Sequence, residues 1–113
     1  MTIKDLETKL GFTCLQCEFE DGPLTGAYTS DLLSDVMANA PDDSVLITIQ
    51  AHKNTVAVST LADVKAILLC NKRIPEDDML QAAKNEKIAI YQTDKNQFQA
   101  SCLIGAALEG KAL

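Results

Sequence analysis

Two of the four cysteines, Cys14 and Cys17, have the C-x-x-C spacing of zinc knuckles and of redox-active cysteine pairs. A structural zinc site needs four ligands, but the sequence has no second cysteine pair and no histidine at a matching spacing. Residues three apart in a regular strand also point to opposite faces. We therefore predict that Cys14 and Cys17 are structural and bind no metal, that Cys70 and Cys102 are small core residues, and that all four cysteines stay reduced.

His52 is the only histidine of the chain. No residue at metal-ligand spacing, no serine elbow and no paired base accompanies it, so nothing indicates a metal centre or a catalytic triad. It could bind a ligand from a loop or be a solvated loop residue, and the sequence leaves both interpretations open. The acidic run Glu76–Asp78 stands at the start of a predicted helix, where the helix dipole explains it without a bound cation.

The sequence lacks the usual phosphate-binding signatures. No G-x-x-x-x-G-K-[ST] motif occurs, and only five glycines are present. Lys53, Lys72 and Arg73 could hold an anion beside helix N-termini, although a solvated, charge-balancing role fits them as well. We predict that the chain is not an enzyme, has no catalytic residues, and needs no cofactor or metal.

Composition excludes some classes of partner. The chain has 113 residues, of which 47% are hydrophobic, and a formal net charge of −6. This length suits one domain with an ordinary core. An acidic chain without clustered Lys and Arg is not expected to bind nucleic acid. No apolar run is long enough to cross a bilayer and the N-terminal segment is not a targeting signal, so we expect a cytoplasmic protein without membrane contact.

Hydrophobic periodicity and turn residues predict alternating helices and strands. Thr2 is the predicted cap of the first helix, Ser30 or Asp31 of the second, and Thr93 or Asn96 of the last. Thr55–Ala62 alternates as a strand would, but a crossover between parallel strands favours a helix there. The predicted helices are Ile3–Leu10, a segment between Asp31 and Pro41, Thr55–Ala62, a segment that starts at Pro75, and Gln97–Leu108, and the predicted strands are Phe12–Glu20, Gly26–Thr29, Val45–Gln50, Val64–Cys70 and Ile88–Tyr91.

This order predicts an α/β fold, a single three-layer domain over residues 1–113 with a mostly parallel sheet covered by helices on both faces. The C-terminal ends of parallel strands meet along one edge, where ligands of open α/β sheets usually bind. Polar side chains are costly beside buried strands, yet they follow these strands directly. The candidate ligand-binding residues at this edge are Ser30, Asp31, Gln50, His52, Lys53, Asn54, Asn71, Lys72, Arg73 and Thr93.

Residues 28–54, YTSDLLSDVMANAPDDSVLITIQAHKN, followed by a helix and by VKAILLCNKR, resemble the small DRTGG-domain proteins, especially the stand-alone members found with iron-only hydrogenase genes in anaerobic bacteria. The resemblance covers nearly the whole chain, and SDLLSDVMANA is a fairly specific segment. It implies a fold similar to the N-terminal domain of HPr kinase/phosphorylase and to the related Mur ligase domain. The name-giving motif is not preserved, because His52-Lys53 stand near the Asp-Arg pair and Cys70-Asn71-Lys72 near the Thr-Gly-Gly.

The resemblance and the residues together predict a non-catalytic regulatory or ligand-binding module that senses a small anionic or nucleotide-like molecule. The alternative is a pure protein–protein interaction subunit associated with hydrogenase or signalling components. A third interpretation, an enzyme with an unrecognised site, has no motif to support it. A homodimer is expected because the last predicted helix is apolar around most of its circumference. Its apolar residues are Phe98, Cys102, Leu103, Ile104, Ala106, Ala107 and Leu108.

Overall fold

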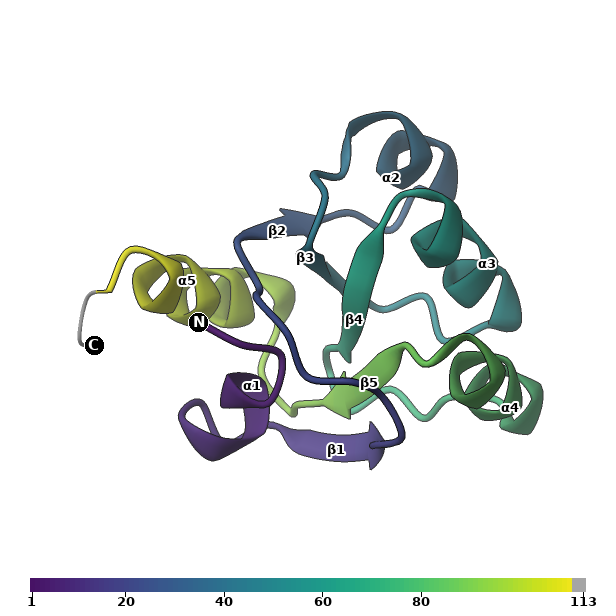
Figure 1. Cartoon of the computed structure of the whole chain (residues 1–113), viewed down its shortest axis with the longest axis horizontal. Helices are drawn as coiled ribbons and strands as arrows, with labels where there is room; N and C mark the ends of the chain where they lie inside the picture. Colours follow the sequence, from purple (N-terminus) through teal and green to yellow (C-terminus); the bar gives the residue numbers. More distant parts are fainter. Residues whose placement is uncertain (111–113) are drawn as a thin grey trace.

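The computed structural model describes residues 1–110, whose arrangement is shown in Figure 1. The last three residues of the predicted domain, 111–113, lie outside the described residues. Helices and strands alternate along most of the chain. The elements are α1 Asp5–Thr8, β1 Thr13–Gln16, β2 Gly26–Thr29, α2 Leu33–Asn39, β3 Ser44–Thr48, α3 Lys53–Leu61, β4 Val64–Leu69, α4 Asp77–Glu86, β5 Ala89–Gln92 and α5 Gln97–Leu108.

Within residues 1–110, five strands form one sheet in the order β1-β5-β4-β3-β2. The strands β2, β3, β4 and β5 are parallel to their neighbours, and only β1 at one end runs antiparallel, against β5. Helices α1 and α5 pack on one face of the sheet, and α2, α3 and α4 pack on the other (Figure 1). The predicted α/β fold with three layers and a mostly parallel sheet is therefore confirmed.

The central strands β3 and β4 are enclosed by both helical layers. Every residue of β3 is buried, and so is every residue of β4 except Lys65, which is half-buried. Val45 and Ile47 pack with the α1 and α5 side, whereas Leu46 packs with the α2 side. Burial on both faces explains why these strands appear in the sequence as continuous apolar runs. It also fixes the positions of the loops that follow them.

Tight turns close the N-terminal edge of the parallel strands. Asp43 precedes β3 and Asp63 precedes β4, and both have left-handed backbones, with φ of 53° and 59°. Aspartate adopts this region more readily than most residues. The backbone N–H of Asp43 donates to the carbonyl of Asp63 at 3.0 Å, which joins the two turns. The longer and more polar loops lie at the opposite edge.

The predicted caps of the first two helices are wrong. Helix α1 spans only four residues, and Thr2 lies outside it in an isolated bridge with Pro23. Helix α2 begins after an N-cap at Leu32 that makes no side-chain capping bond. Ser30 and Asp31 precede that position, and the Asp31 carboxylate points instead toward the end of β3.

The later helices agree better with the sequence. Pro75 was predicted to start α4, but it lies one residue before the N-cap, Glu76. The segment at Thr55–Ala62 is helical as predicted, and α3 begins slightly earlier, at Lys53. The last helix has the predicted bounds, and of the two caps considered it uses Asn96. Its side chain accepts from the backbone N–H of the third helical residue in a reciprocal capping box.

The prediction that all four cysteines stay reduced is wrong for Cys14 and Cys17, which form a disulfide. The pairing of β1 with β5 shifts between Cys14 and Gln16, so a β-bulge interrupts the alternation of faces. The two Cα atoms are consequently 5.9 Å apart, within the span that a disulfide bridges. The same bulge ends β1 well before the predicted boundary. Cys70 is buried as predicted, whereas Cys102 is exposed on α5, contrary to the prediction.

Candidate functional site

The carboxylate of Asp31 joins several elements at the C-terminal edge of the parallel strands. Its Oδ1 accepts hydrogen bonds from Thr48 Oγ1 at 2.9 Å and from Ile49 N at 3.0 Å. It also accepts from Gln97 Nε2 at 3.0 Å. The backbone carbonyl of Asp31 accepts from Gln50 Nε2 at 2.9 Å. One residue therefore ties the β2–α2 loop to the end of β3 and to the first turn of α5.

A second link joins the loops after β3 and β4. His52 Nδ1 lies 2.7 Å from Glu76 Oε1, and the backbone N–H of Glu76 donates to the carbonyl of Ala51 at 3.3 Å. Both side chains of the His52–Glu76 pair are 59% exposed. An ion pair in water contributes little to stability, so the pair orients the imidazole more than it holds the fold together. His52 is thus a fixed residue at the edge, with much of its ring open to solvent.

The loops after β4 and β5 are joined through the backbone. The N–H of Asn71 donates to the carbonyl of Lys95 at 2.9 Å, and that of Lys72 donates to the carbonyl of Thr93 at 2.8 Å. Both donors have left-handed φ, 56° and 53°. Asparagine tolerates this region, but for lysine it costs about 1–2 kcal/mol. Asn71 and Lys72 form a turn directly after β4. Strained backbone of this kind is often found at functional sites.

Three cationic side chains follow the strands, Lys53 at the start of α3 and Lys72 and Arg73 in the loop after β4. Lys53, Lys72 and Arg73 are exposed. In the part of the chain that the structure describes, their charged groups make no hydrogen bond or ion pair. The backbone of Arg73 is fixed, because its carbonyl accepts from Gln92 Nε2 at 2.9 Å. The charges of Lys72 and Arg73 are therefore available to an anion at this edge.

The residues predicted to bind a ligand do not all lie in the same part of the structure. Lys53 and Asn54 line a hollow of about 520 Å³ between α3 and α4, on the side of Val56 and Ala82. Thr93 is buried, and its backbone joins the loops. The remaining predicted residues, Ser30, Asp31, Gln50, His52, Asn71, Lys72 and Arg73, belong to the three loops that follow β2, β3 and β4.

Exposed apolar side chains accompany the polar cluster. Leu32 follows β2, Ile74 follows β4 and Phe98 stands in the first turn of α5 after β5, with exposures of 65%, 80% and 78%. Sequence reasoning assigned Phe98 to a dimer surface and did not include it in the site. It also missed Gln97, although this glutamine stands at the start of a helix that follows a buried strand, the same signal that identified the other loops. The edge combines free cations with exposed apolar groups.

The thiol at this edge is not a nucleophile. Cys70 directly follows β4 and is fully buried. Burial raises the pKa of the Cys70 thiol to about 11, and the negative charge of Asp31 adds to the effect. A thiol with such a pKa is almost entirely protonated near neutral pH.

Among residues 1–110, no three His, Cys, Asp or Glu side chains form a group that could hold a metal ion.

Comparison with known proteins finds a solved structure with a similar fold. None of the protein-family models searched matches the sequence, and no curated protein matches it. A solved structure described as the CBS and DRTGG domains of the regulatory region of Clostridium perfringens pyrophosphatase, complexed with activator, diadenosine tetraphosphate, superposes with a TM-score of 0.68 at 14% identity. The match covers 90% of this chain and 45% of that chain.

No helix within residues 1–110 is both long and apolar enough to cross a membrane. At 14% identity, the structural likeness establishes the fold. The shared fold is consistent with the resemblance of residues 28–54 to DRTGG domains. Residues 1–110 therefore form an α/β domain with a five-stranded, mostly parallel sheet, similar in fold to part of a solved structure that contains CBS and DRTGG domains.

Proposed function

We propose that this chain is a non-catalytic regulatory module of the DRTGG type, acting in the cytoplasm, that binds a small anionic, nucleotide-like molecule at the C-terminal edge of its parallel strands. The observation that carries the proposal is the arrangement of the loops after β2, β3, β4 and β5. Hydrogen bonds accepted by the Asp31 carboxylate, the contact between His52 and Glu76, and the backbone N–H groups of residues 71 and 72 hold these loops together. Loops fixed before binding lose little conformational freedom when a ligand arrives, which favours affinity.

The chemistry of the edge supports a nucleotide-like ligand. Lys72 and Arg73 supply positive charge in a chain whose net charge is −6, so an anion is drawn to this place against a negative background. The guanidinium of Arg73 can bind phosphate oxygens with two parallel hydrogen bonds. Leu32, which is 65% exposed in the loop after β2, presents an apolar surface against which a base can pack. Phosphate and base would then contact different loops of one edge.

The pyrophosphatase regulatory region supports the same class of ligand, since that protein was solved with diadenosine tetraphosphate. The likeness covers less than half of that chain. What the comparison contributes is the choice of probes: diadenosine tetraphosphate, ATP, AMP and inorganic triphosphate.

A thermal-shift screen with these four probes tests the proposal. A probe present at one hundred times its dissociation constant stabilises the folded state by about 2.7 kcal/mol. The double variant His52→Ala and Lys72→Asn should lose most of the shift given by a binding probe, while its unliganded melting temperature stays within a few degrees. Asparagine is chosen at position 72 because it tolerates the left-handed backbone better than alanine.

Lys87 provides a matched control. It is an exposed lysine with a left-handed φ of 56°, and it lies at the end of α4, before β5, at the other edge of the sheet. Lys87→Asn removes the same charge from the same backbone conformation and should leave the ligand shift unchanged. If Lys87→Asn lost the ligand-induced shift in melting temperature as fully as the double variant does, the loss would be due to net charge and not to the strand edge. A binding probe whose shift survives in the double variant would contradict the proposed location.

The second candidate function is association with another protein chain, either a second copy of this chain or a hydrogenase or signalling component. Helix α5 favours such an association. The helix carries no charged residue from Gln97 to Leu108, yet it buries only Ala100 and Ile104 fully. Phe98 and Cys102 are exposed on its outer side, where α5 lies at the margin of the molecule (Figure 1). We propose that a second copy of the chain covers this surface.

Light scattering at tens of micromolar tests the dimer, with wild type expected at twice the chain mass. Phe98→Ser should shift the mass toward the monomer. Leu61 is a matched control, because it is 73% exposed on α3, in the opposite helical layer. Leu61→Ser should leave the mass unchanged. A monomer mass for wild type at that concentration would contradict the dimer without affecting the ligand proposal.

A further inference from the structure

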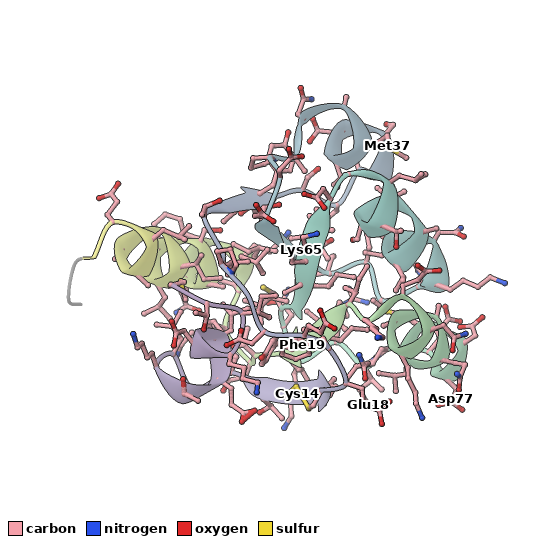
Figure 2. All side chains as sticks on the ribbon, viewed as in Figure 1. Cys14, Glu18, Phe19, Met37, Lys65 and Asp77 are labelled. Atoms are coloured by element: carbon pink, nitrogen blue, oxygen red, sulfur yellow. A yellow bond between two sulfur atoms is a disulfide. The ribbon has the colours of Figure 1, made fainter. Side chains whose placement is uncertain are left out.

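The disulfide between Cys14 and Cys17 stands beside two hollows. One, of about 150 Å³, is lined by both cysteines together with Lys4, Phe19 and Tyr91. Cys17 also lines a second hollow, of about 410 Å³, toward α4. Figure 2 shows Cys14 on β1 at the margin of the molecule, with Phe19 nearby. Cys17 therefore borders both hollows.

The two cysteine residues differ in exposure. Cys17 is exposed, whereas Cys14 is half-buried and packs against the core cluster of α1 and α5. In thiol–disulfide exchange a thiolate attacks one sulfur and the other leaves, and access decides which sulfur is attacked. The geometry makes Cys17 the attacked sulfur and Cys14 the leaving thiol.

Hydrogen bonds of Gln16 hold the segment around the disulfide in addition to the bond itself. The Gln16 side chain is buried, and its Nε2 donates to the carbonyl of Ile88 and to that of Glu18, each at 3.0 Å. Its Oε1 accepts from the N–H of Glu18 at 2.9 Å. These bonds fasten the bulge to the start of β5. The disulfide closes a loop with only two residues between its cysteines, so it constrains the unfolded chain little.

We propose that Cys14 and Cys17 form a reversible thiol–disulfide exchange site for small dithiols. A thiolate of the dithiol attacks Sγ of Cys17, a mixed disulfide forms, and the Cys14–Cys17 bond breaks. Cys14 leaves as a thiolate and takes up a proton. The second thiol of the reductant loses its proton and attacks the mixed disulfide, which releases Cys17 as a thiolate that is protonated in turn. The protein gains two electrons and two protons, and the dithiol becomes a cyclic disulfide.

This site is separate from the proposed ligand edge. Strand β1 is antiparallel to β5, with Thr13 opposite Gln92 and Gln16 opposite Ile90. The Gln16 end of β1 therefore lies toward the start of β5, whereas the ligand edge lies at the end of β5. The exchange site consequently does not depend on the ligand proposal.

Dithiothreitol titration of the native protein tests the site, with thiols counted by alkylation and mass spectrometry and folding followed by circular dichroism. We expect two alkylated cysteines after unfolding the oxidised protein and four after reduction, while the reduced protein stays folded and re-forms the bond when oxidised dithiothreitol is supplied. Four free thiols in protein equilibrated with oxidised dithiothreitol would overturn the proposal. So would reduction that occurs only together with unfolding.

Variants that keep one cysteine of the pair test which sulfur is attacked. In a Cys102→Ser background, Cys14→Ser leaves Cys17 and the buried Cys70, and Cys17→Ser leaves Cys14 and Cys70. We expect the Cys17 thiol to form a mixed disulfide with oxidised glutathione at least about tenfold faster than the Cys14 thiol in folded protein, because access governs the exchange rate. Equal rates, or a faster Cys14, would overturn the assignment. Circular dichroism of each variant establishes that the rates belong to folded chains.

Discussion

Replacing Asp31 by alanine should destabilise the fold more than any other change at the strand edge. The Asp31 carboxylate accepts three hydrogen bonds, from Thr48, Ile49 and Gln97, so the substitution removes the acceptor shared by three donors. A net hydrogen bond contributes about 1 kcal/mol, and bonds to charged groups contribute more. Asp31 is half-buried, and water replaces part of what is lost, so we keep the lower value for each bond. The expected loss in the free energy of unfolding is about 3 kcal/mol.

This loss converts into a large change in melting temperature. Unfolding entropy is about 2.1 cal/mol/K per residue near 60 °C, which gives about 0.24 kcal/mol/K for 113 residues. A loss of about 3 kcal/mol therefore lowers the melting temperature by about 13 °C. Urea titration at 25 °C, followed by circular dichroism, measures the free energy directly.

Two control variants separate this role from a general charge effect. Asp31→Asn keeps an oxygen acceptor in place and should cost about 1 kcal/mol. Asp94 is an exposed aspartate in the loop after β5, and Asp94→Ala should change stability by no more than about 0.5 kcal/mol. A loss below about 1 kcal/mol for Asp31→Ala, or an equal loss for Asp94→Ala, would refute the view that Asp31 holds the edge together.

Three further predictions follow from single features. Hydrogen bonds from Tyr28 and Asn39 hold the pKa of the Asp35 carboxyl below its usual 3.8. The ionised Asp35 carboxylate therefore contributes fully to stability above pH 3.8, and this contribution is lost as the pH falls through the lowered pKa of the folded state. In acid titrations the wild type should therefore lose stability more steeply than Asp35→Asn below pH 3.8. Among the described residues, the buried Ser59 hydroxyl has no hydrogen-bond partner, so Ser59→Ala should raise the free energy of unfolding by about 1 kcal/mol in urea titrations. Incubation with labelled ATP and HPr protein should transfer no phosphate, and transfer above background would show that the chain is an enzyme.

The sheet could be predicted because its signal is strong and local. Val45–Gln50 and Val64–Cys70 are mostly apolar, as expected for strands buried between two helical layers. The crossover argument then correctly made Thr55–Ala62 a helix despite its alternating pattern. Because parallel strands end at one edge, the sequence also indicated which loops lie together.

The details that decide the chemistry could not be predicted so well. A bulge of one residue changes which faces Cys14 and Cys17 occupy, and no residue type in TCLQC signals it. Asp31 fits the pattern of a helix cap, and only the tertiary structure places its carboxylate against β3 instead. Cys102 was expected in the core as a small residue, but packing on one face of the sheet buries only part of α5.

Amide chemical shifts of ¹⁵N-labelled protein during titration with diadenosine tetraphosphate, ATP, AMP and inorganic triphosphate test the central claim most directly. With a binding probe, the account predicts that the largest shifts fall in the loops of residues 30–32, 50–52, 71–74 and 93–98. The hollow between α3 and α4, which Lys53 and Leu61 line, serves as an internal comparison and should change little. Largest shifts at that hollow, or no shift with any of the four probes at millimolar concentration, would contradict the claim that the strand edge binds a nucleotide-like anion.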